Sequence, residues 1–158
     1  MECATFNAKC EGVEKAASFR DAFKARRCIV RADLYYEWKK LTPNPKGPKQ
    51  PYAVARADGL PLLLAGLWET WKGGGAEPLR TFTILTTAPI AGSKIAELHH
   101  RVPVVLSADD VAVWLGERQG DLPGLMKACP DDWLRMWKVS VRVGNVKNND
   151  RSLIDEAA

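Results

Sequence analysis

The stretch YAVARADGLPLLLAGLW, Tyr52 to Trp68, decides the fold of this chain. It contains two apolar runs of strand length, and the dipeptide Asp58-Gly59 between them is a strong hairpin signal. A third run, TFTILTT from Thr81 to Thr87, follows a flexible stretch of three glycines, residues 73–75. We therefore expect these three runs to be strands that pair with one another.

The segments before this region predict a helix, two strands and a loop. In SFRDAFKARR, residues 18–27, Ser18 is a plausible helix cap with Asp21 three residues later, and Phe19, Ala22 and Phe23 line one face. Strands are expected next, at Cys28 to Ala32 and in LYYEWKK, residues 34–40. Four prolines and a glycine in LTPNPKGPKQP, residues 41–51, then predict a stiff surface loop.

The segments after this region predict one helix and one strand. SADDVAVWLG, residues 107–116, carries Ser107 as a plausible cap and Gly116 as a stop. WKVSVRV, residues 137–143, indicates a strand, and the polar tail from Asp150 is expected to be loose. The pattern predicts an α+β fold with a mostly antiparallel, curved, barrel-like sheet and a few short helices.

Length and composition favour a single domain over residues 1–158. The chain is 46% hydrophobic, which is enough for one core. With 23 basic and 19 acidic residues, the formal net charge of +4 permits a polyanionic partner such as nucleic acid. No apolar run has membrane-spanning length and no signal peptide is recognisable, so we expect a cytoplasmic protein without membrane contact. We also expect a monomer.

Four cysteines stand at irregular intervals without a C-x-x-C pair. This spacing favours reduced thiols over a zinc cluster or a disulfide framework. We therefore expect no metal and no cofactor.

Glu37 is a candidate for proton transfer, because Tyr36 and Trp38 flank it in the predicted strand. Bulky rings on both sides would shield the carboxyl group from water, as in many acid-base sites. Strand alternation gives the competing interpretation, in which Glu37 points outward while both rings point inward. Periodicity alone does not decide between the two.

Both histidines of the chain, His99 and His100, lie side by side before Arg101. An arginine can pair bidentately with a phosphate, and an adjacent imidazole can then act as acid or base on the group that the phosphate positions. If the segment is extended, His99 and Arg101 share a face and His100 points away. The alternative is one structural and one exposed imidazole, neither of them catalytic.

Several tryptophans stand beside basic residues, a combination that can stack on bases in a single-strand groove. Core packing is the competing explanation for most of the six. The candidates for stacking are Trp38, Trp68 and Trp71, with Lys39, Lys40 and Lys72 near them.

An ordered series of motifs from about Phe6 to Asn148 resembles the SOS-response-associated peptidase (SRAP) family of abasic-site-shielding proteins. The series consists of FNAKCEG, FRDAFKARRCIVRADLYYEW, PYAVARADGLPLLLAGLWETW, TFTILTTA, ELHHRVPVVL, WL and VGNVKN. The resemblance implies binding of single-stranded DNA at an abasic deoxyribose. It also implies an N-terminal cysteine, exposed by removal of methionine, that forms a thiazolidine crosslink with the opened sugar or supports a lyase step.

The resemblance also assigns roles to residues. The family's Asn-Ala-Arg motif falls on residues 7–9, its Tyr-Glu-Trp motif on residues 36–38, and its His-x-Arg-x-Pro motif on residues 99–103. The implied catalytic residues are Asn7, which orients the sugar or amine, Glu37, which shuttles protons, and His99, which assists ring opening. The implied DNA-binding residues are Lys9, Arg101 and Trp38, and His100 is expected to be dispensable.

Two departures from the family pattern concern the start of the chain and its second motif. The family's Met-Cys-Gly-Arg start is absent, and Glu2 before Cys3 should prevent removal of the initiator methionine. We thus expect a domain that is N-terminally truncated relative to the family, either a fragment or a shortened relative, with impaired crosslinking. Lys9 replaces the motif's arginine, which keeps the charge but loses the planar fork.

Two other functional classes stay open. A cysteine-type peptidase would use Cys3, Cys10 or Cys28 with His99, although no local nucleophile signature supports it. A non-catalytic nucleic-acid-binding module would need only the basic surface and the aromatic residues. A thiol probe tests the first class, and a salt titration of single-strand affinity tests the second.

Overall fold

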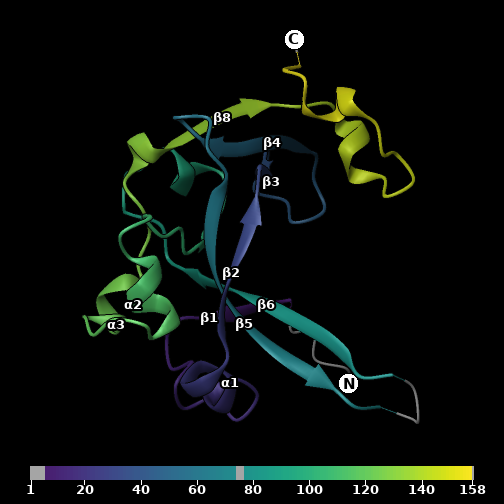
Figure 1. Cartoon of the computed structure of the whole chain (residues 1–158). Coiled ribbons are helices and arrows are strands. Elements are labelled where there is room, and N and C mark those ends of the chain that lie inside the picture. The colour runs from purple at the N-terminus through teal and green to yellow at the C-terminus, as the bar shows by residue number, and fades with distance from the viewer. Residues whose placement is uncertain (1–5, 74–76, 158) are drawn as a thin grey trace. The chain divides into compact units, whose positions relative to one another are not determined.

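The computed structural model describes residues 6–73 and 77–157. The chain divides into two compact units, each built from three segments. The first unit comprises residues 1–31, 63–88 and 101–129, and the second comprises residues 32–62, 89–100 and 130–158. Figure 1 labels their helices and strands.

The first unit contains a five-stranded sheet. Its strands are β1 (Asn7–Lys9), β6 (Leu79–Thr87), β5 (Leu62–Trp71) and β2 (Arg27–Ala32) in that order, and β7 (Val102–Pro103) also pairs with β6. The strands β5 and β6 are antiparallel, with Gly66 opposite Ile84. The short strand β1 runs parallel to β6, with Asn7 opposite the same Ile84.

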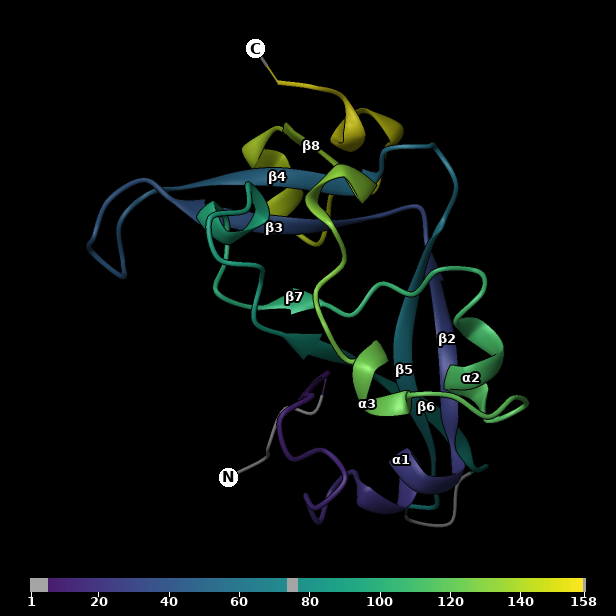
Figure 2. The same ribbon diagram turned by 90° about the vertical axis from the view of Figure 1, so that its left-hand side faces the viewer.

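Trp114 lies at the centre of the core of the first unit. It belongs to helix α2 (Val111–Leu115), is fully buried, and donates a hydrogen bond of 2.8 Å from its Nε1 to the carbonyl oxygen of Cys28 in β2. The ring of Phe23, from helix α1 (Arg20–Ala25), contacts it edge to face at 6.2 Å. Figure 2 shows helix α3 (Leu122–Leu125) next to α2. A buried indole of this size makes Trp114 a main source of apolar burial in this unit.

Of the three residues predicted to begin or end helices, only Gly116 has the predicted role. Helix α1 begins at Arg20 and has no side-chain cap, so Ser18 does not play the predicted role. Ser107 accepts a hydrogen bond from the Asp110 N–H at 3.2 Å, which closes the turn before α2 rather than capping the helix itself. Gly116 ends α2 in the left-handed region, with φ of 82°, as its position predicts.

The second unit contains a three-stranded antiparallel sheet. Strand β4 (Lys49–Arg56) lies between β3 (Leu34–Lys40) and β8 (Leu134–Lys138), as Figure 2 shows. Ala53 and Val54 of β4 are fully buried. β4 begins inside the stretch that was predicted to be a loop.

The predicted pairing of Tyr52–Arg56 with the following run is wrong. The turn itself forms, because Gly59 has φ of 79° and the Asp58 carboxylate accepts a hydrogen bond from the Leu60 N–H at 3.1 Å. However, β4 has β3 and β8 on its two edges, and β5 has β6 and β2. Each strand is already paired on both sides, so the turn connects two sheets instead of closing a hairpin.

The C-terminal part also differs from expectation. Strand β8 ends at Lys138, and the predicted continuation forms a 3-10 helix, η3 (Val141–Gly144). The tail is not loose, because Arg151–Ile154 forms a second 3-10 helix, η4, with Leu153 buried. The Asp150 carboxylate caps it by accepting a hydrogen bond from the Ser152 N–H at 3.1 Å.

The α+β class and the mostly antiparallel sheets are confirmed, with three short α-helices in the described ranges. The strands form two sheets rather than one, and barrel-like closure stays a prediction. None of the helices in residues 6–73 and 77–157 is long and apolar enough to cross a bilayer.

Candidate functional site

The predicted site residues fall into two groups, one in each unit. The first unit carries Asn7, Lys9 and Arg101, and the second carries Glu37, Trp38 and His99. Each group has its own chemistry.

Glu37 and His99 face each other in the second unit. His99 Nδ1 lies 4.0 Å from Glu37 Oε2, and the Trp38 N–H donates to Glu37 Oε1 at 3.2 Å. The Glu37 side chain is 21% exposed and the His99 side chain 37% exposed. A half-buried carboxylate therefore lies beside a partly exposed imidazole, and both are groups of the kind that take part in acid-base chemistry.

Strand alternation on β3 explains this placement. Glu37 and Lys39 share one face of β3, and Tyr36 and Trp38 take the other. The Glu37 face does not simply point into solvent, because Lys39 Nζ also lies 2.9 Å from a carboxylate oxygen of Glu97. This hydrogen bond raises the pKa of Lys39. Lys39, predicted as a cation near a stacking tryptophan, is thus ion-paired.

A short helical turn and the residues just after it supply the partners of Glu37 and Lys39. Glu97 ends the 3-10 helix η1 (Ile95–Glu97), and the His99 N–H donates to the Ile95 carbonyl at 3.3 Å. One turn therefore carries Glu97 to Lys39 and His99 to Glu37.

The histidine segment is not extended, so the condition under which His99 and Arg101 would share a face is not met. Leu98 has helical dihedral angles, and β7 begins only at Val102. The argument that alternate faces distinguish the imidazoles therefore does not apply. The contact with Glu37 distinguishes them instead, since His99 makes it while His100 is exposed, with its ring centroid 4.3 Å from that of His99.

In the first unit, strand β1 presents Asn7 and Lys9 outward. Both are exposed, whereas Ala8 between them is 1% exposed and belongs to the core. The parallel pairing with β6 sets Lys9 opposite Thr86. The first and third residues of the Asn-Ala-Arg-like motif are thus available at the surface. Its middle residue, Ala8, packs in the core.

Arg101 is ion-paired with Glu11. Its Nη1 and Nη2 atoms lie 2.7 and 2.8 Å from the two carboxylate oxygens, and Nη2 also donates to the carbonyl oxygen of Thr86. The hydrogen bonds from Arg101 lower the pKa of Glu11 to about 2, and Glu11 in turn raises the pKa of Arg101. Arg101 is therefore held in a fixed position, and its charge is matched by a carboxylate.

Sequence reasoning missed Glu11, and no local signal points to it. Strand β1 ends at Lys9 and Glu11 lies in the turn that follows, so the two-residue period of the strand does not extend to Glu11. The nearby Lys9 charge also contributes to the lowered pKa of Glu11.

The tryptophans divide between packing and exposure. Trp114 is core, as expected for most of them, and the Trp68 ring is covered by the Arg80 guanidinium 5.0 Å from its centroid. Trp71 is 57% exposed. Trp38 is half-buried on β3, opposite Pro51.

Cys10 and Cys28, two candidates of the peptidase hypothesis, are poor nucleophiles. Burial raises the pKa of the Cys10 thiol to about 12 and also raises that of Cys28. Neither is a thiolate near neutral pH, and the thiolate is the reactive form. Cys3, the third candidate of the peptidase hypothesis, lies outside the described residues. Over residues 6–73 and 77–157, no group of three or more His, Cys, Asp and Glu side chains could hold a metal ion.

The chain thus combines an α+β fold with two mostly antiparallel sheets, a contact between Glu37 on β3 and His99 after η1, and an exposed Asn-x-Lys pair on β1. Residues 1–146 match the family SOS response associated peptidase (SRAP), and the chain belongs to this family.

Relatives in several organisms are similar to this chain in sequence. Abasic site processing protein YoqW of Bacillus subtilis is 34% identical over 152 residues, which cover 94% of this chain and 66% of the relative. Abasic site processing protein YedK of Escherichia coli is 31% identical, with 94% of this chain and 65% of the relative covered. The chain therefore spans just under two thirds of the length of these relatives.

Solved structures agree with the fold. A protein of Bacteroides thetaiotaomicron matches with a TM-score of 0.84 at 24% identity, covering 98% of this chain and 66% of that one. A protein of Bordetella bronchiseptica matches with a TM-score of 0.74 at 28% identity, covering 85% and 65%.

Proposed function

We propose that this chain binds single-stranded DNA as a monomer at abasic sites and that Glu37 and His99 transfer protons on the abasic sugar. The relatives are named abasic site processing proteins, which supports the choice of substrate. The observation that carries the proposal is the approach of His99 Nδ1 to Glu37 Oε2 at 4.0 Å.

The ring of an abasic deoxyribose must open, with two proton transfers, before the sugar can form a bond to a nucleophile. Opening the ring breaks the bond between C1 and the ring oxygen, which needs a proton on that oxygen and loss of the proton from the C1 hydroxyl. In the proposal, His99 donates to the ring oxygen and Glu37 accepts the hydroxyl proton. The product is an aldehyde, which an amine can attack to form a Schiff base.

The remaining predicted residues have binding roles in the proposal. Asn7 orients the sugar or the attacking amine through its amide group. Lys9 and Arg101 attract backbone phosphates, and Trp38 contributes a ring on which a base can stack. A thiazolidine crosslink, implied by the family resemblance, would need a cysteine with a free α-amine, and Cys3 lies outside the described residues.

The test uses the chain with single-stranded DNA that carries one abasic site. Borohydride trapping measures the rate of Schiff-base formation, and a denaturing gel without reductant detects any stable adduct. Glu37→Gln should slow trapping by a factor on the order of 100 or more while DNA affinity stays the same. Glu117→Gln, which removes an exposed carboxylate elsewhere, is the matched control. Trapping at the wild-type rate by a folded Glu37→Gln protein would refute the role of Glu37.

A further inference from the structure

The turn that carries His99 is too short to keep its shape without contacts from other parts of the second unit. Its 3-10 helix, η1, has three residues, and the His99 N–H closes the turn by donating to the Ile95 carbonyl oxygen at 3.3 Å. Helical turns of this length are marginal in water, because nucleation fixes several residues for very few hydrogen bonds. The direction of the imidazole therefore depends on what holds the turn.

Burial holds the inner side of the turn. Ile95 is 3% exposed and Leu98 is 8% exposed. Apolar burial is non-directional, so it fixes how deep the turn lies but not how far the turn can slide or tilt. The side chains of Glu97 and His99 are 67% and 37% exposed, so directional contacts must fix the outer side.

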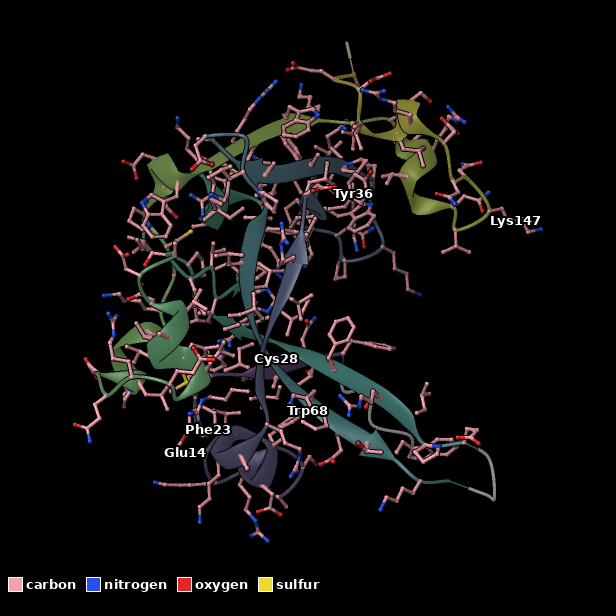
Figure 3. The ribbon with its side chains drawn as sticks, viewed as in Figure 1. Glu14, Phe23, Cys28, Tyr36, Trp68 and Lys147 are labelled. Atoms are coloured by element: carbon pink, nitrogen blue, oxygen red, sulfur yellow. The ribbon has the colours of Figure 1, made fainter. Side chains whose placement is uncertain are left out.

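The first directional contact joins the end of the turn to β3. Lys39 Nζ lies 2.9 Å from Glu97 Oε2. Lys39 shares a face of β3 with Glu37, which follows the Tyr36 labelled in Figure 3. Glu97 and His99 are likewise two residues apart, so the two contacts between turn and strand run side by side. A movement of the turn that separates His99 from Glu37 must therefore also stretch the contact with Lys39.

The second directional contact holds the beginning of the turn. The N–H of Lys94, the residue before η1, donates to Asp131 Oδ2 at 2.9 Å. Asp131 begins the 3-10 helix η2 (Asp131–Trp133), which leads directly into β8. Because β3 and β8 are the outer strands of the three-stranded sheet, the turn is attached at both sides of one sheet.

We propose that Lys39 and Asp131 are positioning residues, which hold the turn at its two ends so that the His99 imidazole stays within reach of Glu37. The inference rests on the proposed function, because it concerns the same proton transfers. Lys39 acts through Glu97, and Asp131 acts through the backbone of the turn. Misplacement of a reacting group by about 1 Å can lower a rate by a factor on the order of 100, so contacts of this kind affect catalysis without touching the sugar.

A phosphate contact is the competing role for Lys39, because a lysine beside the site can neutralise the DNA backbone. The structure favours the positioning role, since the Glu97 carboxylate already matches the charge of Lys39 and their hydrogen bond raises the pKa of Lys39. The two roles have different consequences. A phosphate contact changes the affinity for DNA, whereas a positioning residue changes the rate at saturating DNA.

The test measures borohydride-trapped Schiff-base formation as a function of the concentration of abasic single-stranded DNA. Lys39→Met and Asp131→Ala should each lower the maximal rate roughly three- to tenfold and change the half-saturating DNA concentration by less than about twofold. Lys39→Arg and Asp131→Asn keep the donor or acceptor of each contact and should restore most of the rate. Lys49→Met and Asp132→Ala make the same changes of charge at exposed residues of β4 and η2, and should leave the rate unchanged.

Two further measurements separate positioning from a general loss of stability. Glu97→Gln combined with Lys39→Met should cost no more than Lys39→Met alone, because both remove the same contact. Amide hydrogen exchange reports the turn directly. The His99 N–H should exchange about two- to fivefold faster in Lys39→Met and in Asp131→Ala, as expected for loss of one exposed polar contact, and at the wild-type rate in the two control variants.

Three results would overturn the positioning role. The first is a wild-type maximal rate in Lys39→Met and Asp131→Ala while Glu37→Gln slows trapping. The second is a loss confined to DNA affinity, which would make Lys39 a phosphate contact. The third is wild-type exchange of the His99 N–H in both variants. Trapping at the wild-type rate by Glu37→Gln would instead refute the proposed function, and the positioning role with it, whatever the exchange rates are.

Discussion

Arg101 and Glu11 lie in bidentate contact, with Nη1–Oε1 and Nη2–Oε2 distances of 2.7 and 2.8 Å. A phosphate that binds Arg101 must share it with this carboxylate or displace it. Glu11 therefore weakens the attraction of this surface for DNA while it fixes the position of the guanidinium.

Glu11→Gln should strengthen binding to single-stranded DNA by roughly threefold at low salt and make the affinity fall more steeply with salt, since one more phosphate can be neutralised. A titration at several salt concentrations measures both effects. Glu14→Gln makes the same change in net charge at an exposed position and should have a smaller effect. If the two variants bind alike, the ion pair does not control access to Arg101.

The same pair predicts a pH dependence of stability. The pKa of Glu11 is lowered from 4.5 to about 2 by Arg101, so the ion pair stabilises the folded state fully above pH 4.5 and loses this effect as the pH falls towards 2. Glu11→Gln should therefore melt at a lower temperature than the wild type at neutral pH, with the gap closing below pH 4.5. Thermal melts across this range measure the gap, and a gap that persists to pH 2 would contradict the assignment.

The two histidines should differ in effect. His99→Ala removes the imidazole that faces Glu37 and should slow borohydride-trapped Schiff-base formation by a factor on the order of 100. His100→Ala should change the rate by less than about threefold, which is well below the usual contribution of an acid-base group. Equal losses in both variants would show that the contact with Glu37 does not identify the catalytic imidazole.

Cys10 should resist alkylation in the folded protein. Burial raises its pKa to about 12, so almost none of it is thiolate at neutral pH. Peptide mapping after iodoacetamide treatment should show Cys10 unmodified in buffer and fully modified in urea. Rapid labelling of Cys10 in buffer would revive the cysteine-type peptidase hypothesis.

Trp114→Ala should lower the free energy of unfolding by about 3–5 kcal/mol, because it leaves a large cavity and removes the hydrogen bond to Cys28. Urea denaturation followed by circular dichroism measures the loss. Trp71→Ala, at a residue that is 57% exposed, should cost much less.

Most strands could be predicted from the sequence because their apolar runs are long and separated by turn residues. Residues 34–40 and 81–87 are strands, as their patterns indicate. What the sequence did not predict is which strands pair. Asp58-Gly59 specifies a turn, but the partners of β4 and β5 come from distant segments, so no local signal reveals them.

The site could be predicted as residue types but not as contacts. Glu37 and His99 were both candidates, yet nothing in their separate motifs indicates that they lie 4.0 Å apart. Arg101 was predicted to hold a phosphate, and its ion pair with Glu11 depends on β1 pairing beside Thr86, a long-range feature. Lys39 was likewise treated as a surface cation because its partner, Glu97, is far along the chain.

Each unit is made of three segments that alternate along the chain. This arrangement affects the order in which the sheets can form during translation and the way in which the gene can recombine. Strand β8, which completes the sheet of the second unit, leaves the ribosome long after β3 and β4. Strand β1 similarly cannot pair until β6 has been synthesised. Any break in the gene within residues 32–129 leaves parts of both units on each side, so neither unit can be exchanged alone by simple recombination. The two units must therefore be gained, lost and folded together.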